Sequence, residues 1–288
     1  MSCYRTHQHS RVLVLNWGLT MQFEYHPDFV EQAVFLASRL DAGRECELHA
    51  FVDRLYAIPD AELKDRAFRE AYAERFTQWR LGAALAGAID EWKAPAGRIT
   101  RCVVIPASRK SNQNVDLLVK PTTESEMQRT LLLQVRPQSL FEPAALRTWL
   151  HRELQHVSDM LDEDFGYDPS DLDGAVWERN VQRDRYSVLW RIYVAGRLIR
   201  EGRYDDRELA ALRTAFRRAF THQGVAPSGE VFDCLLGRER LTHAQLVGWA
   251  KRPESLLGDE YPAQVDEVES QLLGGEDVAS ECQTIVGV

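Results

Sequence analysis

The spacing of apolar residues predicts helices in the first third of the chain. From Pro27 to Leu40, apolar residues recur every three or four positions, and a second, shorter helix is predicted from Cys46 to Ala57. A long helical stretch follows over 60–92, with Gly82 and Gly87 as positions where it bends or breaks. The segment Ala-Pro-Ala-Gly that comes next is a firm stop.

The pattern then changes to β-branched segments and back to helices. Strands are predicted at 98–105, 115–120 and 129–136. Pro143 begins a helix to Leu161 with one apolar stripe, made of Leu146, Leu150, Leu154, Val157 and Leu161. A further helix is predicted over 175–200, and another follows the capping box that begins at Asp205. Two shorter helices are predicted before residue 253, and Thr242 caps the second of them. The fold class is therefore α+β, mostly helical, with a small three-stranded sheet beside the helix over 143–161.

Charge divides the chain into a neutral body and an acidic end. The net charge is −9, and residues 253–288 contain nine acidic residues and no Lys or Arg. We therefore predict a flexible tail over 253–288 and a single domain over 21–252. Residues 1–20 read as an extension or an upstream mis-start, because Met21 begins the short segment Met-Gln-Phe-Glu-Tyr-His that leads into the first helical pattern.

Composition excludes several classes of protein. With 288 residues and 44% hydrophobic positions the chain can bury a core, yet no run reaches the roughly 18 apolar residues of a membrane span. The five cysteines lie far apart and form no C-x-x-C pair, which is typical of a reducing cytoplasm. A neutral body offers no general attraction for nucleic acid. We expect a cytoplasmic protein with neither nucleic-acid nor membrane partners.

One short segment carries candidate chemistry. Residues 152–156 read Arg-Glu-Leu-Gln-His, which is the metal-binding pattern H-E-x-x-H with Arg152 in the first His position. At about 100° per residue, Arg152, Glu153 and Asp159 all lie within roughly 60° of His156 around the helix. The polar face formed by these residues borders the leucine stripe, where a half-buried site would sit.

This segment resembles the active-site helix of zincin metallopeptidases and of related uncharacterised bacterial proteins that carry H-E-x-x-H-x-x-D. Zincins place a long helix, a small sheet, the metal-binding helix and a helical part in this order, and the predicted elements follow it. The resemblance implies a zinc ion held by His156 and Asp159. It also implies that Glu153 is the general base, which activates water for attack on a peptide or amide carbonyl.

Three further residues are candidates for the same site. His151 lies about 140° from His156 and shares a metal with it only if a π-bulge inserts one residue into the helix. Glu178 is a candidate downstream ligand, with a solvated carboxylate at a helix start as the alternative. Tyr167 follows Gly166 and is a candidate oxyanion stabiliser or an aromatic anchor for its loop.

Arg152 weakens the expectation of zinc. At an effective dielectric of ~20, a guanidinium 6 Å from a divalent ion is repelled by roughly 5 kcal/mol, against about 10–16 kcal/mol for a whole structural zinc site.

Three hypotheses follow: a zincin-like hydrolase with weakened zinc binding, a non-catalytic descendant that binds a peptide or protein, and a helical interaction protein without metal ancestry. In the third, the polar face is only a solvated edge. In the second, Arg152 replaces the metal and pairs with Asp159 or Glu163.

Overall fold

The structure, a computed structural model, describes residues 12–15, 21–92, 99–121, 127–172, 176–221 and 227–257. The chain divides into two compact units, whereas the sequence analysis treats 21–252 as one domain. The first unit contains the described residues up to Asp168 and the segment Val194–Asp206, and the second contains Pro169–Tyr193 and the residues from Arg207 onward.

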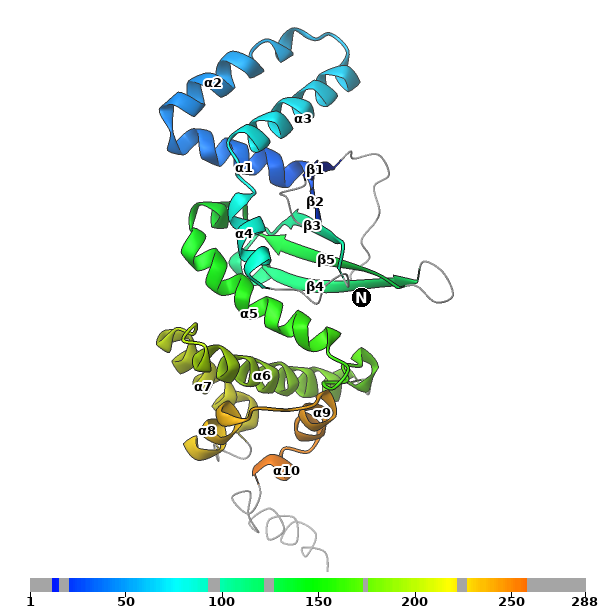
Figure 1. The fold of residues 1–288 in the computed structure, drawn as a ribbon, viewed down its shortest axis with the longest axis vertical. Coiled ribbons are helices and arrows are strands. Elements are labelled where there is room, and N and C mark those ends of the chain that lie inside the picture. The colour runs from blue at the N-terminus through cyan, green and yellow to red at the C-terminus, as the bar shows by residue number, and fades with distance from the viewer. Residues whose placement is uncertain are drawn as a thin grey trace, which may run out of the picture. The chain divides into compact units, whose positions relative to one another are not determined.

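The first unit contains a mixed five-stranded sheet (Figure 1). Its strands are β1 (Leu13–Leu15), β2 (Gln22–Tyr25), β3 (Arg101–Pro106), β4 (Asn114–Pro121) and β5 (Met127–Val135). They lie in the order β1-β2-β3-β5-β4. The β2–β3 and β3–β5 pairs are parallel, while β1 runs antiparallel to β2 and β4 runs antiparallel to β5. Both edge strands are therefore antiparallel to their neighbours.

The sheet has five strands, so the predicted number of three is wrong. The three predicted strands correspond to β3, β4 and β5, and the sequence analysis misses β1 and β2. In β2 the side chain of Glu24 is buried, because Arg101 on β3 donates to both of its carboxylate oxygens at 2.5 Å. The alternation in Gln-Phe-Glu-Tyr is regular, but four residues are too few to predict a strand. β1 lies within the predicted extension 1–20, whose other described residue is Val12.

Helices fill the long connection between β2 and β3. They are α1 (Pro27–Leu40), α2 (Ala42–Val52), α3 (Ala61–Gln78) and α4 (Ala83–Glu91), with a short 3-10 helix at Leu55–Ala57. The stretch predicted as one helix over 60–92 breaks between α3 and α4, where Arg80 adopts a φ of 51°. Gly82 precedes α4 as its N-cap, so the first of the two predicted glycines marks the break, and Gly87 lies inside α4.

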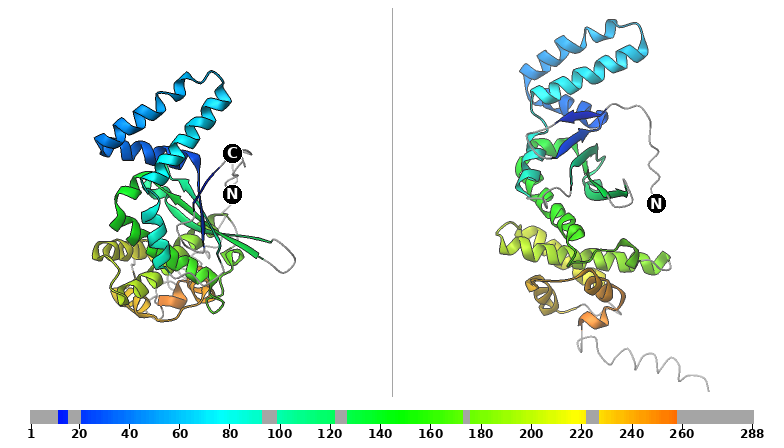
Figure 2. Two further views of the ribbon diagram at one scale, coloured as in Figure 1. Left: turned by 45° about the horizontal axis from the view of Figure 1, so that its top comes forward. Right: turned by 45° about the vertical axis from the view of Figure 1, so that its right-hand side comes forward.

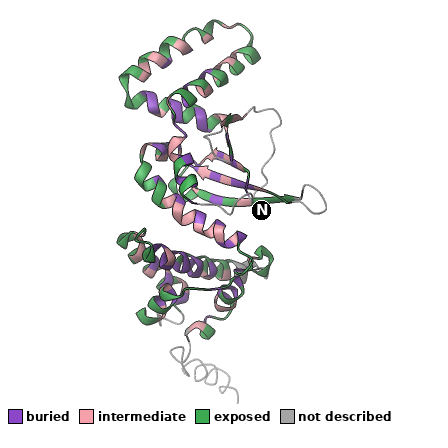
Figure 3. Ribbon diagram, in the orientation of Figure 1, coloured by how far each residue is buried: buried purple, intermediate pink, exposed green. Residues whose placement is uncertain are grey.

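The core lies on one face of the sheet. Alternate strand residues are buried against α1, α4 and α5 (Pro143–Leu161), and they include Phe23, Tyr25, Cys102, Val104, Leu131 and Leu133. The helices of this unit lie on that side, and the strands show alternating burial (Figures 2 and 3). Residues of the opposite face, such as Arg101, Val103 and Leu132, are only half-buried. In its described residues, the first unit is thus a layer of helices on one face of a sheet whose other face is mostly half-buried.

The second unit is helical in its described part. Its elements are the N-terminal portion of α6 (Val176–Arg200), most of α7 (Asp206–Phe220), and α8 (Gly229–Gly237), α9 (His243–Lys251) and α10 (Glu254–Leu257). Phe216, Phe220 and Phe232 are fully buried and pack ring to ring. α10 falls within the predicted tail, whose remainder, 258–288, lies outside the described residues. In the described part of the chain no helix has the length and apolar character to cross a membrane.

Candidate functional site

Helix α5 forms as its sequence predicts. Pro143 occupies the first turn, and the helix ends at Leu161. The five residues of the predicted stripe are all buried, with exposed fractions of 6% or less. The helix is anchored to α4, where the Trp92 indole N–H donates to Ser158 Oγ at 2.8 Å. A rigid, core-packed helix therefore positions the candidate residues.

Asp159 is the most deeply buried charged residue of this face. Its exposed fraction is 2%, and Arg197 Nη2 donates to its Oδ2 at 2.7 Å. Arg197 lies on the C-terminal part of α6, which belongs to the same unit as α5. A buried carboxylate is stable only with a well-placed cation or hydrogen bonds, and the guanidinium provides both. The candidate third ligand thus takes part in a buried ion pair.

Arg152 and Glu153 also form an ion pair. Both Nε and Nη2 of Arg152 donate to Glu153 Oε1 at 3.1 Å, and both side chains are about four-fifths buried. The pairing of Arg152 with Asp159 or Glu163, one alternative from the sequence, stays a prediction. The residue in the place of the first His ligand therefore lies against the candidate general base.

His151 is directed toward α4. Its Nε2 lies 3.2 Å from Oε2 of Glu91, at the end of α4. Burial lowers the pKa of the His151 imidazole, and the positive charges of Arg203 and Arg147 lower it further, while Glu91 partly opposes these effects. α5 is α-helical throughout and contains no π-bulge. His151 therefore stays on the side of the helix that faces away from His156.

The remaining candidates occupy separate places. His156 is half-buried on α5. In the loop after α5, Phe165 is 3% exposed while Tyr167 is half-buried, so Phe165 is the main aromatic anchor of that loop. Glu178 belongs to α6, but its side chain lies outside the described residues.

These residues do not form a ready metal site. Among the described residues, no group of three or more His, Cys, Asp or Glu side chains could hold a metal ion. His151 lies beside Glu91, and Asp159 is paired with Arg197. In the described structure, two of the candidate ligands are therefore already engaged by other protein groups.

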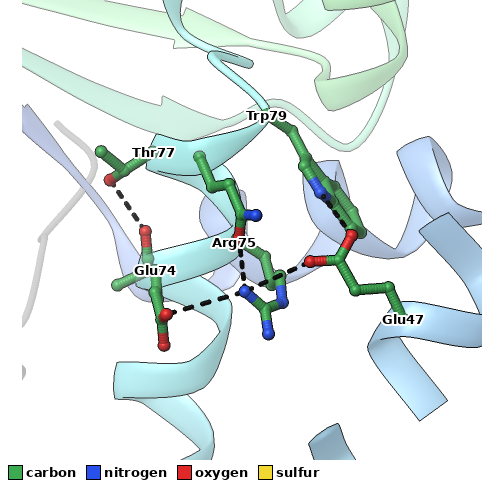
Figure 4. A network of polar contacts seen from close by, with 7 residues as sticks. Glu47, Glu74, Arg75, Thr77 and Trp79 are labelled. Atoms are coloured by element: carbon green, nitrogen blue, oxygen red, sulfur yellow. Dashed lines mark hydrogen bonds and ion pairs between the residues drawn. The ribbon is translucent and has the colours of Figure 1, made fainter. Parts of the chain in front are cut away.

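Two further polar clusters were not predicted from the sequence. Between α2 and α3, Nη1 of the largely buried Arg75 lies 3.4 Å from Glu47 and 3.7 Å from Glu74, and Trp79 donates to Glu47 at 3.3 Å (Figure 4). An open pocket of about 720 Å³ lies beside this network. Because the carboxylates already neutralise the guanidinium, we interpret this cluster as a structural link between the two helices.

The second cluster is buried in the helical unit. His243, which is 1% exposed, lies 2.7 Å from the Tyr186 hydroxyl through Nδ1 and 3.4 Å from Asp171 Oδ2 through Nε2. From the sequence alone, His243 is expected to be an isolated surface or capping residue, but it is buried against partners that come from distant segments of the chain. The contacts join α9, α6 and the 3-10 helix Pro169–Leu172.

Comparisons with known proteins add no relative. A scan against protein-family models found no match, and searches of curated proteins and of solved structures found none either. The likeness to zincins thus rests on residues 152–159 and on the order of the elements.

Proposed function

We propose that this chain is a non-catalytic, zincin-like protein that binds an extended polypeptide and carries no zinc on α5. The observation that carries this proposal is the buried ion pair between Asp159 and Arg197. The Arg197 guanidinium supplies the positive charge beside Asp159 that a metal ion would otherwise supply. The proposal belongs to the second of the three hypotheses from the sequence.

Electrostatics favours this arrangement over a metal centre. A zinc ion near Asp159 and His156 would face two guanidinium groups, those of Arg152 and Arg197. Each would repel a divalent ion by roughly 5 kcal/mol at 6 Å and an effective dielectric of ~20. Loss of the first His ligand adds to this cost. The carboxylates of Glu153 and Asp159 offset part of this repulsion, but each would have to give up its ion pair to help hold zinc.

Polypeptide binding is supported by the sheet edge next to α5. β4 is an edge strand of eight residues, and α5 packs beside it. Extended peptides commonly bind proteins by adding a strand to such an edge, where backbone hydrogen bonds supply the affinity. A chain that lost its hydrolytic centre would keep this surface.

Zinc analysis tests the proposal. We expect no stoichiometric zinc in protein purified without chelators, and no zinc in Arg152→His, because Arg197 still holds Asp159. In the double variant R152H/R197Q, we expect added zinc to bind and to raise the melting temperature. The matched control is the same variant with His156→Ala, which should not respond. Stoichiometric zinc in the unmodified protein that disappears in His156→Ala would overturn the proposal.

The second candidate is a zinc-dependent peptidase. It is favoured by the position of Glu153, His156 and Asp159 on one uninterrupted helix. A zinc-dependent peptidase would hydrolyse a peptide substrate, this hydrolysis would require zinc, and the variant Glu153→Gln would lose it.

We also infer a cytoplasmic location for the protein. Cys46, Cys102 and Cys234 are free thiols in the described part of the chain, as expected in a reducing compartment.

A further inference from the structure

The outer edge of β4 has no partner strand in the described structure. β4 pairs only with β5, from Asn114 opposite Gln134 to Pro121 opposite Met127. Outside that ladder, the backbone groups of β4 form no hydrogen bond to another described backbone group. A long edge with free N–H and C=O groups is a template for another strand.

The two faces of β4 differ in character. Val115 and Leu117 face the core, opposite Leu133 and Leu131 on β5. On the other face, Asp116, Leu118 and Lys120 are exposed, and the residues opposite them on β5 are Leu132, Thr130 and Gln128. None of these β5 residues is charged, so neither Asp116 nor Lys120 faces an opposite charge across the ladder.

Apolar side chains are exposed along the same strand. Leu118 is 40% exposed and Val119 is 44% exposed, on opposite faces of β4. Strands at sheet edges usually limit pairing by carrying charges or by being short; β4 carries Asp116 and Lys120, but its length leaves room for a partner strand. Eight residues with two adjacent exposed aliphatic side chains favour an edge that is covered in the functional state.

We propose that the β4 edge pairs with β4 of a second copy of this chain, antiparallel and about a two-fold axis at Leu118. This inference rests on the proposed polypeptide-binding function and names the partner. In this register, Leu118 lies opposite itself and Leu117 lies opposite Val119 of the other copy. Asp116 lies opposite Lys120 of the other copy, and the symmetry creates this pair twice.

The charge pattern selects both the partner and the register. Asp116 and Lys120 have opposite signs and are equally distant from Leu118, so the edge is complementary to itself when reversed. A slip that moves the axis to Leu117 places Asp116 opposite Leu118 of the other copy and loses both charge pairs. A parallel, in-register pairing places Asp116 opposite Asp116. Of these arrangements, only the antiparallel one centred on Leu118 pairs Asp116 with Lys120. It also places the exposed Leu118 and Val119 opposite apolar residues of the other copy.

Charge reversal of the full chain tests the pairing. We expect light scattering and sedimentation to find a dimer for the unmodified protein, and monomers for Asp116→Lys and for Lys120→Asp, because each single change creates two like-charge pairs. The double variant D116K/K120D should dimerise again. An equimolar mixture of the two single variants should form heterodimers, since each copy then meets the opposite charges. Asp65→Lys, an exposed change on α3, is the matched control and should remain dimeric.

The outcomes separate this inference from the proposed function. An unmodified protein that stays monomeric at all concentrations, or single variants that remain dimeric, would overturn the β4 pairing. Neither result affects the zinc measurement, which tests the non-catalytic assignment separately. Zinc in the unmodified protein would in turn overturn that assignment without changing the oligomeric state.

Discussion

At the scale of single residues, the partners of the α5 side chains are the least predictable part of the structure. Helical spacing places Glu153, His156 and Asp159 on one face from sequence alone. Arg197 is 38 positions from Asp159, and Glu91 comes from a helix that precedes the sheet. Such pairs arise only when distant helices pack together. The sequence therefore predicts the candidate groups but not the charges that neutralise them.

The buried pair leads to a stability prediction. Arg197→Gln leaves the Asp159 carboxylate buried without its cation, so we expect a loss of about 3 kcal/mol in the free energy of unfolding. Arg197→Lys keeps the positive charge but not the planar geometry and should cost less. Urea unfolding monitored by circular dichroism measures both. Arg191→Gln, on the exposed side of the same helix, is the control and should change stability by under about 0.5 kcal/mol. Equal losses in Arg197→Gln and the control would contradict a stabilising role of the pair.

At the scale of elements, strong local signals explain which segments could be predicted. α5 has a proline in its first turn and an unbroken apolar stripe, and both of its bounds agree with the sequence prediction. β1 and β2 have three and four residues, too few for a strand pattern to be recognised beside the helical pattern that follows. The absence of a π-bulge in α5 could not be derived from sequence either, because it depends on packing.

Two helix caps of the second unit should differ in strength. Thr242 caps α9 with a full capping box, in which its Oγ1 accepts from Gln245 N–H and the Gln245 side chain accepts from Thr242 N–H. Thr242→Ala should therefore cost about 1 kcal/mol in thermal or urea unfolding. Ser228 occupies the same position before α8 but makes no capping hydrogen bond, and its buried Oγ has no hydrogen-bond partner. Ser228→Ala is the matched variant, and we expect it to be neutral. A similar loss in both variants would show that the capping hydrogen bond is not the cause.

At the scale of the whole molecule, the α+β class and the mainly helical content could be predicted, but the topology could not. The alternation of helix and strand patterns was sufficient for the class. Strand order requires long-range pairing, such as Phe23 with Cys102, that no local pattern encodes. The division into two units also escapes prediction, because the boundary passes through α6 between Tyr193 and Val194, where helical periodicity continues without a break.

The uneven charge of the chain should control its solubility. Residues 258–288 contain eight acidic and no basic residues, so a chain ending at Leu257 has a net charge of −1 instead of −9. We expect the shortened chain to precipitate at lower polyethylene glycol concentration near pH 7, because repulsion between molecules falls with net charge. A full-length variant with these eight residues changed to Ser or Gln separates charge from length and should behave like the shortened chain. Unchanged solubility in that variant would contradict an electrostatic origin.

The parallel pairing of β2 with β3 has a consequence for synthesis on the ribosome. β2 leaves the ribosome first, but its partner strand follows only after α1–α4 have been made. The β4–β5 hairpin, by contrast, closes over a short connection. During translation, Tyr25 can already pack against Phe29 of α1 and Phe76 of α3, but the backbone edge of β2 stays exposed to chaperones and to aggregation until β3 has been made. The slowest step of folding should therefore be the joining of β2 to β3.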